Sequence, residues 1–230
     1  MKKKILLGAV CLAVALSSTS YAKSGVFVGA NAGISITSTT YSNIFIQAND
    51  LAPKTGAGYM LGLDVGYQQE FLPSMGLRYY LSYNFSNSFA HKTIPGSVTN
   101  GASGALTVVN FNNLLVANVD YFYNLNDKLG AYVGLGVGWS NFFTNFIAGG
   151  EGGSLTATYL GNSFALPFNI GVSMNLGKHQ TIKLGAKIPL VSTSIKPTNG
   201  EAKTALPTGD DGTTATLNNY IIQAGYSYIF

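Results

Sequence analysis

Five charged side chains share a setting that could support ion pairing or ion passage. Charged residues make up only 10% of the 230 residues, against roughly 25% in ordinary soluble domains. Each of the five lies in a segment where apolar residues alternate with small or polar ones, and all stand on the polar parity: Asp64, Arg78, Asp120, Lys183 and Lys187. The sequence therefore predicts that these side chains gather on one protected surface, where opposite charges pair.

The two histidines are the other candidates for chemistry. His91 lies near Ser86 and Ser88, but no spacing indicates a nucleophile and base, because any polar loop places a serine nearby. His179 follows Lys178 with no second histidine or cysteine beside it, so its setting does not indicate a metal site. The sequence predicts a protein without enzymatic activity, cofactor or metal.

The elements that would position these residues are eight segments with a period of two. The clearest is Leu129–Ser140, where Val133 and Leu135 alternate with Gly134 and Gly136. Each segment has about 10–12 residues, the length at which a tilted strand crosses a bilayer. The eight segments are Gly25–Ile36, Ala57–Gln68, Met75–Ser86, about Phe111–Tyr123, Leu129–Ser140, Ser163–Met174, Thr181–Leu190 and Tyr220–Phe230.

The connections and aromatic residues predict how these strands sit in a membrane. Short connections (69–74, 124–128, 175–180) alternate with long polar ones (37–56, 87–104, 141–162, 191–219), as in outer-membrane barrels with short periplasmic turns and long extracellular loops. Outward aromatic residues fall near both ends of the segments, as two interfacial girdles would require. A soluble barrel of the lipocalin type would instead turn its apolar faces inward. We therefore predict an all-β, eight-stranded antiparallel transmembrane β-barrel.

The interior of such a barrel is only wide enough for side chains, so the five charged residues are expected to form a polar plug. Asp64 and Arg78 lie seven residues either side of Phe71, which predicts an ion pair across the hairpin. The alternative is a narrow porin-like channel lined by the same residues. Pro167 and Pro189 cannot donate to a ladder, so bulges or strand ends are expected there.

The N-terminal residues have the pattern of a secretory signal peptide. Three lysines precede a short apolar core, and Ser20-Tyr21-Ala22 offers a cleavage site. This divides the chain into a cleaved signal peptide, residues 1–22, and a barrel domain, residues 23–230. The mature chain then has no cysteine and no basic cluster that would indicate nucleic-acid binding.

The closing residues carry a family resemblance. Tyr226, Tyr228 and Phe230 look like the C-terminal signature that the assembly machinery of outer-membrane barrels recognises. Together with the Gly/Val-rich first strand and the long second loop, the chain resembles the Helicobacter outer-membrane protein family of the Hop/Hor type. The resemblance implies an outer-membrane location among lipid and lipopolysaccharide.

The predicted function is a non-enzymatic surface role. Four long loops would serve surface structure or contact a host-surface ligand or neighbouring molecules. A narrow channel is the second interpretation, and a lipid-modifying outer-membrane enzyme is the third.

Overall fold

The computed structural model describes residues 24–41, 52–72, 74–94, 104–150, 153–198 and 212–230. Within these ranges, no helix has the length and apolar character needed to span a membrane. The predicted signal peptide, residues 1–22, lies outside the described residues. The strands are β1 (Gly25–Tyr41), β2 (Thr55–Leu72), β3 (Met75–Ile94), β4 (Gly104–Asn124), β5 (Leu129–Gly150), β6 (Gly153–Ala165), β7 (Pro167–Asn175), β8 (Gln180–Pro189), β9 (Thr193–Pro197) and β10 (Ala215–Ile229).

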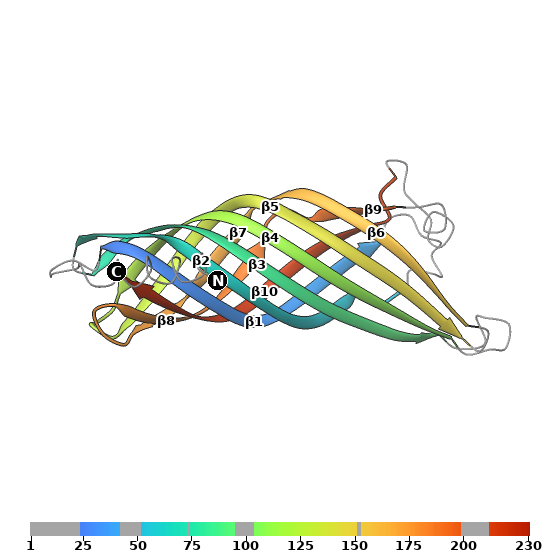
Figure 1. The fold of residues 1–230 in the computed structure, drawn as a ribbon, viewed down its shortest axis with the longest axis horizontal. Coiled ribbons are helices and arrows are strands. Elements are labelled where there is room, and N and C mark those ends of the chain that lie inside the picture. The colour runs from blue at the N-terminus through green and yellow to red at the C-terminus, as the bar shows by residue number, and fades with distance from the viewer. Residues whose placement is uncertain (1–23, 42–51, 73, 95–103, 151–152, 199–211) are drawn as a thin grey trace, which may run out of the picture.

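The strands close into a ring with eight positions (Figure 1). β6 and β7 both pair with β5, and β8 and β9 both pair with β10, so each of these two couples fills one position. β10 returns to pair antiparallel with β1, from Phe27↔Ile229 to Tyr41↔Ala215. Closure gives β1 and β10 a partner on both sides, which matters in lipid because no water there could satisfy a bare strand edge. The predicted antiparallel eight-stranded barrel is confirmed.

The apolar parity of the strands faces outward, as predicted for a membrane barrel and opposite to a lipocalin. On β5, Val133, Leu135 and Val137 are 40%, 51% and 52% exposed. A Cβ atom added to Gly134 or Gly136 would instead collide with the interior side chains of Asp120 or Asn118. The hydrocarbon of the bilayer therefore meets the large apolar side chains, and the small residues line the axis.

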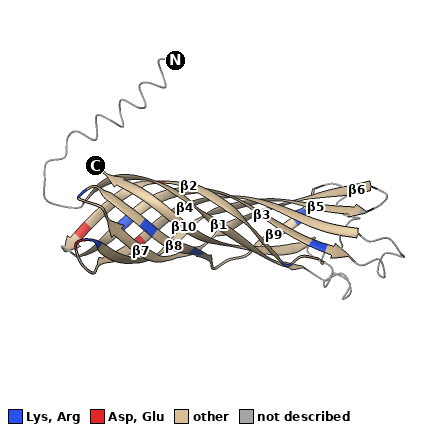
Figure 2. Ribbon diagram, turned by 90° about the horizontal axis from the view of Figure 1, so that it is seen from below, with Lys and Arg blue, Asp and Glu red and all other residues tan. Residues whose placement is uncertain are grey.

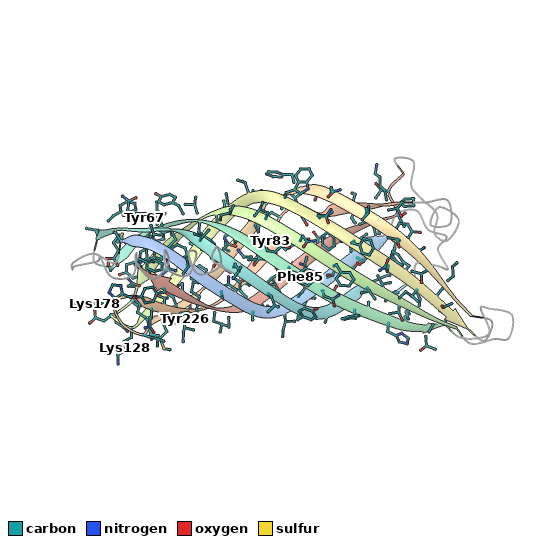
Figure 3. The ribbon with its side chains drawn as sticks, viewed as in Figure 1. Tyr67, Tyr83, Phe85, Lys128, Lys178 and Tyr226 are labelled. Carbon is teal, nitrogen blue, oxygen red and sulfur yellow. The ribbon has the colours of Figure 1, made fainter. Side chains whose placement is uncertain are left out.

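Aromatic side chains form two belts at different heights. Rings on β2, β3, β4 and β5 follow one another around the outer surface, from Tyr59 through Phe85 and Phe111 to Phe143, with centroids 6.3–6.4 Å apart. Tyr67 and Tyr226 lie toward the end that carries the C-terminus, whereas Phe85 lies near the middle of the molecule's length (Figure 3). The strands consequently continue well beyond the outer belt.

The predicted lengths of the long loops are wrong, because much of each predicted loop is strand in the structure. β3 runs to Ile94 and β4 starts at Gly104, inside the predicted loop 87–104. β5 and β6 pair from Gly138↔Ala165 to Gly150↔Gly153, so the described part of the predicted loop 141–162 is paired strand. β1 runs to Tyr41 and β2 starts at Thr55, and the last predicted loop contains β9 and the start of β10. Outside the hydrocarbon a strand no longer needs apolar residues facing outward, so the pattern that marked the crossing segments stops before the strands do.

The two prolines interrupt the wall, as expected. β6 ends at Ala165 and β7 starts at Pro167, while β8 ends at Pro189. Pro167 and Pro189 face each other across the two neighbouring strands. Because neither proline has an N–H to donate, the ladder between these strands ends there.

Candidate functional site

All five predicted charged residues lie inside the barrel. Their exposed fractions are 2–7%, and Figure 2 shows that most, though not all, of the charged residues of the strands lie in the half that carries the C-terminus. Three are cationic and two are anionic, which leaves one excess positive charge: Asp64, Arg78, Asp120, Lys183 and Lys187. Such charges are expensive to bury without partners, so their contacts decide what the interior can do.

The predicted ion pair between Asp64 and Arg78 is wrong. Asp64 instead accepts a hydrogen bond from the ammonium of Lys183, with Nζ 3.2 Å from Oδ2. The hairpin is not centred on Phe71: Leu72 pairs with Met75, with a register shift next to it. This register places Arg78 opposite Gln68, and closure of the ring brings Lys183 of β8 across the lumen to Asp64.

Asp120 is held by hydrogen-bond donors from two other strands. The hydroxyl of Tyr80 donates to its Oδ2 atom at 2.8 Å, and the amide of Asn169 donates to its Oδ1 atom at 3.0 Å. The same Asn169 amide group donates to Asn118 Oδ1 at 3.0 Å, and the ammonium of Lys187 donates to Asn169 Oδ1 at 3.3 Å. β3, β4, β7 and β8 thus contribute to one connected network.

Arg78 lies at the edge of this network nearest the short turns. Its Nε–H donates to Gln68 Oε1 at 2.6 Å, and its guanidinium carbon lies 4.8 Å from the ring centroid of Phe122. The ammonium of Lys183 similarly lies 5.7 Å from the centroid of Phe27. Contacts with aromatic rings therefore stabilise these cations in addition to their hydrogen bonds. We call the five charged residues with Gln68, Tyr80, Asn118 and Asn169 the lower polar network.

Sequence reasoning missed the uncharged members of this network. Tyr80, Asn118 and Asn169 stand on the same inward parity as the charged residues, which is the signal that could have found them. Their partners could not be assigned, because pairing across a lumen depends on how the ring closes.

Inward glycines make room for this network. A Cβ atom on Gly134 would overlap Asp120 Oδ1, and one on Gly185 or Gly171 would overlap the hydroxyl of Tyr132. These glycines lie on strands that face the bulky polar residues. Small and large side chains thus alternate across the lumen, as they must in a narrow barrel.

The other half of the lumen is filled by apolar and aromatic side chains. Phe146 packs edge-on against Tyr159 with centroids 5.0 Å apart, and Tyr41 packs against Phe146 at 6.2 Å. The hydroxyl of Tyr41 donates to the Pro53 carbonyl at 2.8 Å, and burial raises the pKa of this hydroxyl. We call this group the upper aromatic cluster: Tyr41, Ala52, Ala90, Val108, Phe142, Phe146, Ala157, Tyr159, Ile195, Ala215 and Leu217.

A band of uncharged polar side chains is interleaved with the upper aromatic cluster, since Thr144 lies between Phe142 and Phe146 on β5. The Ser88 hydroxyl donates to Thr37, and the Asn110 amide donates to Ser88 at 3.3 Å. The Thr144 hydroxyl donates to Asn110 Oδ1 at 2.8 Å, and the Asn219 amide donates to Ser86 at 2.9 Å. The band carries no charge, so the excess positive charge belongs to the lower polar network.

The wall has a weak seam beside this band. β6 and β9 pair only at Tyr159↔Pro197 and Leu160↔Lys196, and β7 and β8 pair from Pro167↔Pro189 onward. Residues 161–166 and 190–195, all within the described ranges, form no ladder pair with each other. The Leu190 N–H donates to the Leu166 carbonyl at 2.9 Å, and the hydroxyls of Ser163 and Thr193 lie 2.6 Å apart.

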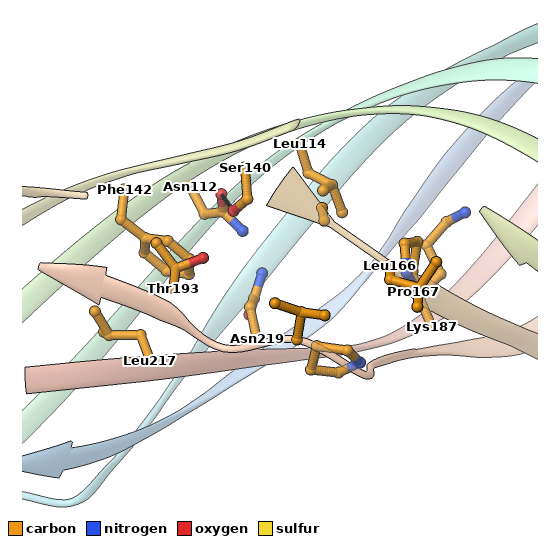
Figure 4. A pocket seen from close by; sticks show the side chains of 13 residues that line it. Asn112, Leu114, Ser140, Phe142, Leu166, Pro167, Lys187, Thr193, Leu217 and Asn219 are labelled. Carbon is orange, nitrogen blue, oxygen red and sulfur yellow. Dashed lines mark hydrogen bonds between the residues drawn. The ribbon is translucent and has the colours of Figure 1, made fainter. Parts of the chain in front are cut away.

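A small hollow of about 30 Å³, enough for one water-sized group, lies behind the seam. Its lining is largely apolar and includes Leu114, Phe142, Leu217 and the two prolines. Figure 4 shows the amides of Asn112 and Asn219 turned toward each other across the hollow, whereas the ammonium of Lys187 is directed away from it. The seam hollow is therefore a small, mostly apolar gap in the packing, and Lys187 is one of its lining residues.

The histidines and the C-terminal residues lie outside the lumen filling. Nδ1 of the exposed His91 is 3.0 Å from the Thr107 hydroxyl. The ring of His179 stacks on Tyr228 at 5.8 Å, and its Nδ1 atom lies 2.9 Å from the Ile229 carbonyl oxygen. Phe230 packs edge-on against Tyr228 at 5.1 Å. The recognition of these C-terminal aromatics by assembly machinery stays a prediction.

Comparison with protein families decides the identity of the barrel. The family model described as Helicobacter outer membrane protein matches residues 62–230, well over half of the chain. The chain belongs to the Helicobacter outer membrane protein family. It is accordingly an integral protein of the bacterial outer membrane, and the predicted family and location are confirmed.

This member of the Helicobacter outer membrane protein family is also similar to barrels from other bacteria. The outer membrane protein AlkL of Ectopseudomonas oleovorans is 24% identical over 209 residues, covering 88% of this chain and 84% of AlkL. The crystal structure of OprG from Pseudomonas aeruginosa matches with a TM-score of 0.50 and 16% identity, over 90% of this chain and 96% of OprG. The outer membrane protease OmpT of Escherichia coli matches with a TM-score of 0.48 and 10% identity, over 93% and 99%. At these identities the structural likeness concerns the fold and not the activity.

Proposed function

We propose that this barrel is a closed, non-enzymatic protein that acts at the cell surface through its projecting strands. The observation that carries the proposal is the filled lumen: the lower polar network and the upper aromatic cluster block the axis at two heights. An open axial pore would need both fillings to move aside. The strands that continue beyond the outer aromatic belt are then the part of the molecule available to the outside.

Conductance of the refolded protein in a planar bilayer tests the closed lumen. We expect no steady conductance steps, because Asp64, Lys183 and Asp120 are engaged with neighbours that span the axis. Steps of uniform size from the unmodified protein would overturn the closed barrel and favour a narrow porin-like channel.

The projecting hairpin of β5 and β6 offers a test of the surface role. Ile147 and Thr156 are directly paired, so residues 148–155 can be replaced by a two-residue Asn-Gly turn without changing the strands below. Cells displaying this variant should lose binding to cultured host epithelial cells, while the protein keeps its heat-resistant compact form on gels. A matched shortening of the β3–β4 hairpin above the Lys92↔Leu106 pair shows which hairpin carries the contact. Full binding by both shortened variants would contradict the surface role.

The broken ladder at the seam favours a second candidate function, the passage of small apolar molecules between the outside and the bilayer through the wall, for which the seam would open wider than the small hollow behind it. The hollow adjoins the upper aromatic cluster on one side and the broken ladder at Leu166 and Leu190 on the other. Leu217→Trp should fill it and slow the uptake of a small probe such as naphthalene by cells. Leu184→Trp, on the lipid face at 55% exposure, is the matched control. Equal uptake by both variants and by the parent protein would remove this candidate.

The absence of catalysis remains part of the proposal. His91 has a hydroxyl neighbour in Thr107, but the hydrogen bond lies on the exposed surface of the hairpin and away from the hollow. Mass spectrometry of lipid A from cells with and without the protein should give identical spectra. A modified lipid A species that disappears in His91→Ala would identify a lipid-modifying enzyme instead.

A further inference from the structure

The two periplasmic turns that join β4 to β5 and β7 to β8 lie against each other. The backbone N–H of Asn175 donates to the Lys128 carbonyl at 2.7 Å. The first turn is fixed by Asn126, whose side-chain oxygen accepts hydrogen bonds from the N–H groups of Lys128 and Leu129 at 2.9 and 2.8 Å. The second turn is closed by a hydrogen bond from the Leu176 N–H to the Gln180 carbonyl at 2.9 Å. These hydrogen bonds therefore fix the shape of each turn and the position of one turn against the other.

A groove runs between these turns. We call it the two-turn groove, and it is lined by Asp127, Lys128, Met174, Asn175, Leu176, Gly177 and Lys178. Its volume is about 600 Å³. The groove is open to solvent and has room for a lipid headgroup.

The groove carries a net positive charge, and its lysines form no ion pair within the described residues. Lys128 and Lys178 are both exposed, and within the described residues neither ammonium has an ion pair or a side-chain hydrogen bond. Asp127 is the one acidic side chain among the lining residues, which leaves a net charge of +1 there. Figure 3 shows the two lysines side by side at the end that carries Tyr226.

The apolar part of the groove lies toward the bilayer. Met174 and Leu176 are 40% and 51% exposed, and Met174 continues the lipid-facing parity of β7. Exposed lysines next to exposed apolar side chains, beneath an aromatic belt, match a molecule with an anionic head and an apolar tail. Lysine stems can lie along such chains while the ammonium reaches the interface.

We propose that the two-turn groove binds the headgroup of an anionic phospholipid from the periplasmic leaflet. Lys128 and Lys178 would hold the phosphate from opposite sides, and Met174 and Leu176 would pack on the upper part of the acyl chains. This inference does not rest on the surface role or on the passage of apolar molecules. It assigns to the periplasmic rim a lipid selectivity that the rest of the lipid-facing wall does not have.

Native mass spectrometry of the refolded protein in a neutral detergent tests the proposal. Phosphatidylglycerol and phosphatidylcholine with identical acyl chains compete for the protein, and the retained lipids are counted. We expect a preference for phosphatidylglycerol that falls about fivefold for each lysine removed, in Lys128→Gln, in Lys178→Gln and in the double variant Lys128→Gln/Lys178→Gln. The control, Lys92→Gln/Lys196→Gln, removes the same charge from the opposite end and should keep the preference.

Three outcomes overturn the proposal. The parent protein could show no preference between the two lipids, or the control could lose the preference as much as the double variant of Lys128 and Lys178. The third outcome is displacement of phosphatidylglycerol by millimolar glycerol phosphate, which would show a site for free phosphate rather than for a lipid. Retention of the compact form on gels by each variant shows that a lost preference is not a loss of fold.

Discussion

The lower and upper halves of the lumen are filled by opposite chemistry although the same strands surround both. On β5, the residues facing the lower half include Gly134 and Gly136, and those facing the upper half include Phe142 and Phe146. In the lower half most apolar side chains point at lipid, with Phe27 and Phe122 as inward exceptions, whereas in the upper half a large apolar and aromatic cluster also points at the axis. The change occurs where the strands leave the bilayer, so one strand carries the pattern of a membrane barrel followed by that of a soluble barrel.

This difference indicates which interactions stabilise each half. Burial of apolar surface stabilises the upper half, and it depends on the volume of the side chains. The lower half depends on whether each buried charge keeps its partner. Substitutions that preserve side-chain volume should therefore be tolerated in the upper half, and substitutions that leave no unpaired charge should be tolerated in the lower half.

The largest expected effect is in the lower half. Lys183→Met keeps most of the side-chain volume but leaves Asp64 buried without its ammonium, which should lower the free energy of unfolding by about 3–5 kcal/mol. Urea titration of the refolded protein, followed by the fluorescence of the single tryptophan, Trp139, measures this. Asp64→Leu/Lys183→Met should recover most of the loss, because no unpaired charge remains. A double variant as unstable as the single one would show that volume also governs this half.

The matching change in the upper half is Phe142→Ala. It should lower the free energy of unfolding by about 3 kcal/mol, at the low end of the usual range because the residue borders the seam hollow. Phe142→Leu should lose less than about 1.5 kcal/mol in the same titration, because most of the volume remains. Equal losses for alanine and leucine would contradict a stability set by packing volume.

A smaller effect is expected where the lower wall meets the network. Gly134→Ala adds a methyl group in the space of Asp120 Oδ1 and the Val119 carbonyl, and overpacking of this kind costs about 1–3 kcal/mol. Gly177→Ala is the matched control, since nothing lies within 4 Å of its added Cβ atom. The thermal midpoint of the compact form on gels should fall for the first variant alone. A similar fall for both would assign the loss to glycine itself rather than to crowding.

The smallest effect is expected at the boundary between the halves. Pro189→Val restores a backbone N–H at the end of β8 and should change the free energy of unfolding by less than about 1 kcal/mol. Hydrogen exchange should nevertheless slow at the Leu190 amide, because the neighbouring ladder can extend into the seam. Unchanged exchange would mean that side-chain packing around the hollow, and not the missing donor, keeps the ladder open.

The crossing segments could be predicted from the sequence because lipid imposes a strict rule on one face of every strand. Val133 and Leu135 could point outward only if Gly134 and Gly136 pointed inward, so parity alone placed the charged residues in the interior. Pro167 and Pro189 likewise marked the strand ends through their missing donors. These inferences needed nothing beyond local alternation.

The contacts and the projecting strands could not be predicted in the same way. The partner of Asp64 depends on a register shift of the β2–β3 hairpin and on the ring closure that brings Lys183 close. Neither feature can be recognised in the local sequence pattern. Phe142 and Phe146 fell in a predicted loop because the outward-apolar pattern ends where water begins. The inward aromatic pattern beyond it is short and interleaved with Asn and Thr.

Pairing of the first strand with the last has a consequence for the order of assembly. The sheet has two unpaired edge strands until β10 pairs with β1. The partner of Asp64 lies 119 residues later in the chain. Contacts between such distant residues form late. The Asp64–Lys183 contact can therefore form only when the ring is complete, so a chain truncated before β8 would have to bury Asp64 without its ammonium partner.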